Sequence, residues 1–124
     1  MANAELLNAT LHHIQEHPET WLQPYYRQGD KGCFAYHAAR IAGGQLISPQ
    51  HVISLPGSDT ELNRNAGLAY NDAARSLGFE ENDTIEIREF ARRALALTED
   101  EADDLFHSDN DLDDLTTLVA QHTA

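Results

Sequence analysis

The sequence is poor in cations and in cysteine, and each shortage excludes a class of protein. Eight Lys and Arg stand against 21 Asp and Glu in 124 residues, which gives a formal net charge of -13. Because binding to nucleic acid or to anionic lipid depends on cations, this charge excludes direct binding to either. One cysteine cannot form an internal disulfide, so a disulfide-stapled secreted scaffold is excluded as well.

Long hydrophobic stretches and a leader are also missing. Apolar runs last only a few residues, far below the roughly 20 that a membrane span requires. The first 13 residues have neither the basic segment nor the apolar segment of a secretory signal. Hydrophobic residues make up 41% of the chain, enough for one core. We therefore expect one cytoplasmic domain over residues 1–124.

The hydrophobic spacing predicts a mainly α fold of five to seven short helices. In residues 3–17, Leu7, Leu11 and Ile14 recur at helical spacing, and Pro18 ends the pattern. The β-rich residues 45–55 form either a small hairpin or an extended crossing. Further helices are predicted at about 19–26, 33–42, 59–77, 84–97, from the Thr98 capping box onward, and from Leu112 to Gln121.

The negative charge is concentrated in the C-terminal third. Residues 80–124 hold 14 acidic and three basic side chains, whereas residues 1–79 hold seven and five. From Glu99 to Asp114 there are nine carboxylates and no Lys or Arg. The run is either a solubilising surface or an acidic face for a basic partner. The candidate partner-binding carboxylates are Glu99, Asp100, Asp103, Asp104, Asp111 and Asp114.

An aromatic segment is the second candidate binding surface. Trp21, Tyr25 and Tyr26 lie close together just after Pro18. Their polar atoms are expected near water, with the rings closing one end of the core. If the acidic face only solubilises the protein, a partner would be sought here.

Cys33 and His37 form the candidate catalytic pair. Cys33 stands at the predicted start of a helix, where the helix dipole favours a thiolate, and His37 follows one turn later. The placement resembles that of a papain-like nucleophile, but the signature of that family around the cysteine is missing. The alternative is a packed core cysteine, because free cysteine is among the most buried residue types.

Two patterns resemble metal sites. His13, Glu16 and His17 match H-x-x-E-H, in which two histidines on one helical face share a zinc ion. The alternative is two surface histidines near a helix end. The carboxylates from Asp109 to Asp113 lack the glycine and glutamate of an EF-hand loop, so they are interpreted as the charged first turn of the last helix. No cofactor is expected.

Three segments together resemble short uncharacterised proteins of actinobacteria and their phages. These segments are W-x-Q at 21–23, C-x-A-x-x-A-x-x-x-x-G at 33–43 and L-T-x-x-E-A-x-x-L-F at 97–106. The resemblance covers about half of the chain and has no counterpart for 56–84. It implies a compact helical domain in a mobile-element or actinobacterial setting, with no activity to carry over.

Three functions remain open at the level of the sequence. The first is a non-enzymatic binding or regulatory protein that acts by protein–protein contact and is directed at a host. The second is an acidic mimic of nucleic acid that inhibits a DNA-binding protein. The third is a small hydrolase that uses Cys33 with a histidine, or a metal at His13 and His17. Whether the protein is a monomer or a homodimer is also left open.

Overall fold

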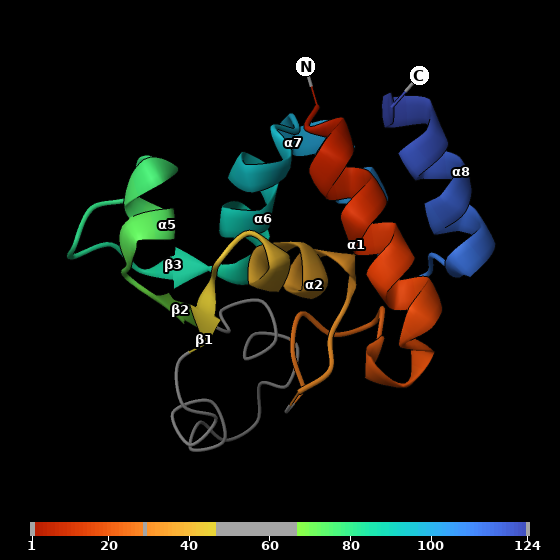
Figure 1. The fold of residues 1–124 in the computed structure, drawn as a ribbon, viewed down its shortest axis with the longest axis horizontal. Helices are drawn as coiled ribbons and strands as arrows, with labels where there is room; N and C mark the ends of the chain where they lie inside the picture. Colours follow the sequence, from red (N-terminus) through yellow and green to blue (C-terminus); the bar gives the residue numbers. More distant parts are fainter. Residues whose placement is uncertain (1, 29, 47–66, 124) are drawn as a thin grey trace.

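The computed structural model describes residues 2–28, 30–46 and 67–123, and these residues are mainly helical (Figure 1). This confirms the expected fold class. The helices and strands, in chain order, are α1 (Ala4–Glu16), the 3-10 helix η1 (Pro18–Thr20), α2 (Phe34–Ile41), β1 (Gln45–Leu46), β2 (Gly67–Ala69), α5 (Asp72–Ser76), β3 (Ile85–Glu86), α6 (Ile87–Leu95), α7 (Glu99–Leu105) and α8 (Leu112–Thr123).

The core lies between α1, α2 and α6. Helix α2 packs against both of the others, and α8 covers α1 from the outside (Figure 1). Leu7, Ile14, Phe34, Phe90 and Leu115 are fully buried there. The amphipathic spacing of residues 3–17 therefore predicts the buried face of α1 correctly. Helices of this length gain most of their stability from such packing and not from intrinsic propensity.

Local chemistry sets the ends of α1. The Asn3 side chain accepts a hydrogen bond from the Leu6 N–H at 3.1 Å and so caps the start. The helix ends at Glu16, two residues before Pro18, as the sequence predicts. The next prediction is wrong: only Pro18–Thr20 is helical where a helix over 19–26 is expected. Residue 21 forms a bridge with Gly32 instead, so the chain turns back on itself.

The main correction concerns residues 59–77. The part that the structure describes begins with strand β2, so a single helix over this range is wrong. Strand β2 lies between β1 and β3 in a three-stranded antiparallel sheet, with Leu68 opposite both Leu46 and Ile85. Hydrogen bonding of β2 to a strand on each side stabilises the extended conformation of 67–69 more than the apolar spacing of 59–77 stabilises a helix. The short α5 begins only after Asn71, whose side chain accepts from the Ala74 N–H at 2.9 Å.

The predicted hairpin at 45–55 is described only at its start. Strand β1 covers Gln45–Leu46 and pairs with β2, a strand far along the sequence. The remaining residues, 47–55, lie outside the described part, as do residues 59–66 of the predicted helix 59–77. Gly43 ends α2 with φ of +99°, a conformation that side-chain-bearing residues rarely adopt. The helical spacing of Phe34, Ala38 and Ile41 predicts that all three face inward, but Ile41, the last residue of α2, is 42% exposed.

A search of the described residues finds no helix that is both long enough and apolar enough to cross a membrane.

Candidate functional site

The candidate pair Cys33–His37 is buried and does not form a thiol–imidazole contact within the described residues. Cys33 is 1% exposed and precedes α2. Burial raises the pKa of its thiol to about 11, although backbone N–H groups of Tyr36 and Ala35 act in the opposite direction. The thiol is therefore protonated at neutral pH, and its place at a helix start does not activate it.

His37 is directed toward the chain after α1. Its Nε2–H donates to the Thr20 carbonyl oxygen at 2.9 Å, and the residue is 3% exposed. Burial lowers the pKa of His37 to about 4; the hydrogen bond to the Thr20 carbonyl acts in the opposite direction, and the positive charge of Arg40 lowers the pKa further. The imidazole is neutral at neutral pH, and this tautomer leaves Nδ1 as an acceptor.

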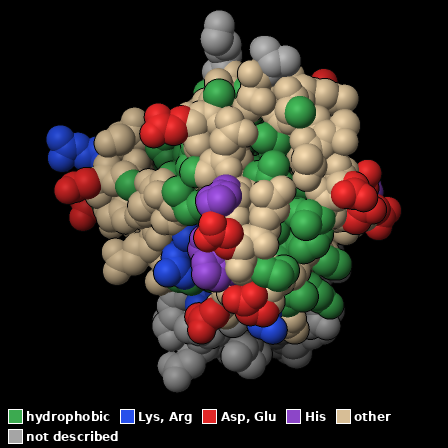
Figure 2. All heavy atoms as spheres, turned by 45° about the vertical axis from the view of Figure 1, so that its right-hand side comes forward, with side chains coloured by type: hydrophobic (Ala, Val, Ile, Leu, Met, Phe, Trp, Pro, Cys, Tyr) green, Lys and Arg blue, Asp and Glu red, His purple; other side chains and the backbone are tan. Residues whose placement is uncertain are grey.

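The histidines of the H-x-x-E-H pattern do meet, and His37 joins them. Ring centroids are 4.9 Å apart for His13 and His17, and 5.1 Å apart for His13 and His37. Figure 2, which brings forward the side with α1 and α8, shows histidine side chains beside a cationic side chain, with carboxylates close by. Among the described residues, no three His, Cys, Asp or Glu side chains are arranged to hold a metal ion.

A cavity of about 520 Å³ lies beside these histidines. Its polar lining comes from α1 and α2 and from the segment between them, and includes His13, His37, Arg40 and Asp30. The sequence indicates His13 and His37 as candidates but does not indicate the cavity beside them. Asp30 lies in the turn before α2 and Arg40 lies near the end of α2, and no spacing rule joins them to His13.

The six candidate carboxylates of the C-terminal third are all exposed on or next to α7 and α8. We call them the acidic α7–α8 surface; they are Glu99, Asp100, Asp103, Asp104, Asp111 and Asp114. Leu105, Phe106 and Leu115 are buried beneath them, and Leu112 is half-buried, as their spacing predicts. The carboxylates therefore stand on helices whose other faces are fixed in the core.

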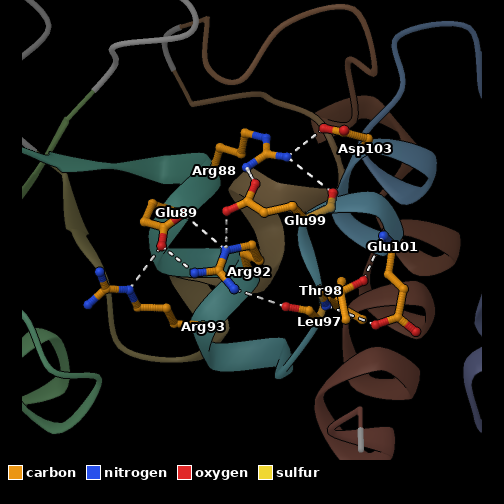
Figure 3. A network of polar contacts seen from close by, with 9 residues as sticks. All are labelled: Arg88, Glu89, Arg92, Arg93, Leu97, Thr98, Glu99, Glu101 and Asp103. Atoms are coloured by element: carbon orange, nitrogen blue, oxygen red, sulfur yellow. Dashed lines mark hydrogen bonds and ion pairs between the residues drawn. The ribbon is translucent and has the colours of Figure 1, made fainter.

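Arginines of α6 pair with two of these carboxylates (Figure 3). Arg88 binds Glu99 at 2.8 Å and Asp103 at 2.5 Å, and Arg92 binds Glu99 at 3.1 Å. The charge pattern of the acidic run does not predict this network, because the run itself holds no Lys or Arg. The sequence does contain a sign of the network: Arg88 and Arg92 stand four residues apart on the predicted helix 84–97, and residues at this spacing share one helical face.

Two more carboxylates of the surface fix the start of α8. The Asp114 N–H donates to Asp111 Oδ1 at 2.8 Å, and the Asp111 N–H donates to Asp114 Oδ2 at 3.1 Å. This reciprocal arrangement is a capping box made by two aspartates. It agrees with the interpretation of Asp109–Asp113 as a charged helix start. Asp100 and Asp104 remain without an ion pair among the described residues, so they are the most available for a partner.

The aromatic segment has a structural role at its Trp-x-Gln end. Trp21 Nε1–H donates to Gln23 Oε1 at 2.9 Å, and that oxygen also accepts from the Phe34 N–H at 3.2 Å. The Gln23 amide donates to the carbonyl oxygens of Leu105 and His107 at 3.3 and 2.9 Å. Gln23, 5% exposed, thus joins the start of α2 to the end of α7.

The three aromatic candidates differ in exposure. Tyr25 is 36% exposed, whereas Trp21 and Tyr26 are half-buried and pack against the core. Of the three, Tyr25 offers the most surface to a partner. The aromatic segment is therefore a smaller candidate surface than the one on α7 and α8.

Comparison with family models, with curated proteins and with solved structures finds no match to this chain.

Proposed function

We propose that this protein is a small non-enzymatic binding protein that contacts a basic protein partner through the acidic α7–α8 surface. The observation that carries the proposal is the placement of exposed carboxylates on two capped helices with buried opposite faces. Such a surface keeps its charges in fixed positions. A fixed negative surface attracts a basic partner over a distance and raises the association rate.

The buried thiol supports a binding role over the hydrolase alternative. A nucleophilic cysteine needs thiolate character and access, and Cys33 has neither. A cytoplasmic location and a host-directed role in a mobile-element setting belong to the same proposal. They rest on the single cysteine, the charge and the resemblance of the three sequence segments.

The test compares association rates of two variants with the same net charge. Asp100→Asn/Asp104→Asn removes two carboxylates of α7 that have no ion pair among the described residues. Glu80→Gln/Glu81→Gln removes two exposed carboxylates from the α5–β3 connection, which lies at the end away from α8 (Figure 1). The probe is a fluorescent lysine-rich peptide, and association is followed by stopped flow at low salt.

We expect the α7 variant to associate several-fold more slowly than the control variant, with a weaker salt dependence. Circular dichroism should show both variants folded, since neither pair caps a helix or binds an arginine. Equal rates for the two variants would mean that only net charge matters. The acidic α7–α8 surface would then be a solubilising surface.

A further inference from the structure

The cavity beside His37 has the size and the lining of a small-molecule site. Its volume of about 520 Å³ lies within the range of ligand pockets, roughly 300–1,000 Å³. It lies between the C-terminal half of α1 and one face of α2. The residues that matter for its chemistry are His13, His37, Arg40, Tyr36 and Asp30.

The lining holds an arginine that has no ion pair among the described residues, in a strongly acidic chain. Arg40, two imidazoles and one carboxylate line the cavity, although the whole chain has a net charge of -13. Arg40 Nη1 donates to the Tyr36 hydroxyl at 3.2 Å, and no described carboxylate forms an ion pair with Arg40. A guanidinium has five N–H donors, so donors remain for a ligand.

The His37 imidazole is held in place, and the His13 ring lies near it. The bond to the Thr20 carbonyl fixes the His37 ring, and the His13 ring lies 5.1 Å from it between centroids. Burial is the main cause that lowers the pKa of His37, and the positive charge of Arg40 acts in the same direction. An anion bound beside Arg40 would offset that positive charge.

We propose that the cavity binds a phosphate-sized oxyanion, with Arg40 as the principal contact and His13 as a second donor. A guanidinium matches two oxygens of a phosphate with two parallel N–H bonds. The exposed side chain of Ile41, which also lines the cavity, suits the carbon portion of a phosphate monoester. This site is separate from the acidic α7–α8 surface, and its existence does not depend on the function proposed for that surface.

The experiment follows histidine ring protons by NMR during titration with inorganic phosphate, with sodium chloride at matched ionic strength as the reference. We expect saturable shifts at His13 and His37 with phosphate and none with chloride. A parallel titration with phenyl phosphate distinguishes the sources: tighter binding than inorganic phosphate assigns the site to a phosphate monoester, and equal binding assigns it to free phosphate.

Two variants of opposite effect complete the test. Arg40→Gln should weaken phosphate binding at least about tenfold, whereas Arg75→Gln, the same charge change on the exposed face of α5, should leave it unchanged. Asp30→Asn should tighten binding, because it removes the one carboxylate of the lining. Absence of saturable shifts in the wild type, or equal affinity in Arg40→Gln, would overturn the proposal.

Discussion

At the scale of single residues, burial decides the chemistry of Cys33. The thiol stands where a helix start would favour a thiolate, but it is 1% exposed and its pKa is raised to about 11. We therefore predict that Cys33 in the native protein labels slowly with a maleimide at pH 7, and completely after denaturation. Rapid stoichiometric labelling of the native protein would contradict this prediction and would support the hydrolase hypothesis.

The same burial sets the cost of removing the sulfur. Cys33→Ala should lower the free energy of unfolding by about 1–2 kcal/mol, because a small cavity is left in the core. Urea denaturation measures this change. Ala120→Ser, a substitution of similar size at an exposed position of α8, is the control and should change the free energy by less than about 0.5 kcal/mol.

His37 should make stability depend on pH. Its pKa is about 4 in the folded protein and near 6.5 when exposed, so the unfolded chain binds the proton more readily between these values. Stability should therefore fall as the pH decreases from about 6.5 to about 4, and this histidine contributes on the order of 2–3 kcal/mol to the loss.

His37→Gln separates this contribution from that of the carboxylates. Glutamine can still donate to the Thr20 carbonyl oxygen but does not titrate, so the variant should show a flatter pH dependence of the free energy of unfolding. Gln15→Ala, at an exposed position of α1 that does not titrate, is the control and should keep the wild-type slope. An unchanged slope in His37→Gln would show that another group is responsible.

Gln23 shows how one buried amide can connect distant segments. Gln23→Leu should remove its hydrogen bonds to Trp21, Phe34, Leu105 and His107 and leave buried polar atoms without a partner. We expect a loss of about 2–3 kcal/mol in the free energy of unfolding. Gln15→Leu, at an exposed position of α1, serves as the control. Equal losses in the free energy of unfolding for the two substitutions would contradict a structural role for the Trp-x-Gln pattern.

At the scale of elements, the sequence predicts the helices, because a helix depends on residues that are close along the chain. The helices at 3–17, 33–42 and 84–97 are found within a few residues of their expected limits, because apolar spacing and end signals are local. The sheet could not be predicted this way. Leu68 pairs with Leu46 and Ile85, and such pairing depends on how distant segments meet.

The candidate sites also divide into features that local sequence predicts and features that depend on how distant segments pack. The exposure of the acidic run follows from the inward spacing of its leucines, so it could be predicted. Its arginine partners lie on α6 and meet it only after folding, as Figure 3 shows for Arg88 and Asp103. The cavity also depends on the packing of α1 against α2, so no local pattern indicates it.

The capping box of α7 is a local prediction that the structure confirms. Thr98 Oγ1 accepts from the Glu101 N–H at 3.2 Å, and Glu101 Oε1 accepts from the Thr98 N–H at 2.8 Å. Thr98→Ala should cost about 1 kcal/mol of stability, measured by urea denaturation. Thr117→Ala, at an exposed position inside α8, should change stability by less than about 0.5 kcal/mol. Similar losses in both would show that the cap contributes little.

At the scale of the whole molecule, negative charge is in excess even after the ion pairs of α6. A chain with a net charge of -13 repels itself in the compact state, and salt screens that repulsion. We therefore predict that the melting temperature rises as sodium chloride is added to a low-salt buffer. A melting temperature that falls with salt would mean that the ion pairs of Arg88 and Arg92 outweigh the repulsion.

The central claim is that the acidic α7–α8 surface is where a basic partner binds. The most direct measurement is a backbone-amide NMR titration of the full chain with the lysine-rich peptide, which reports the place of binding residue by residue. We predict that the largest saturable shifts lie at and around Asp100 and Asp104 on α7 and at the start of α8. Largest shifts at Trp21 and Tyr25, or small shifts spread evenly over the chain, would contradict the claim.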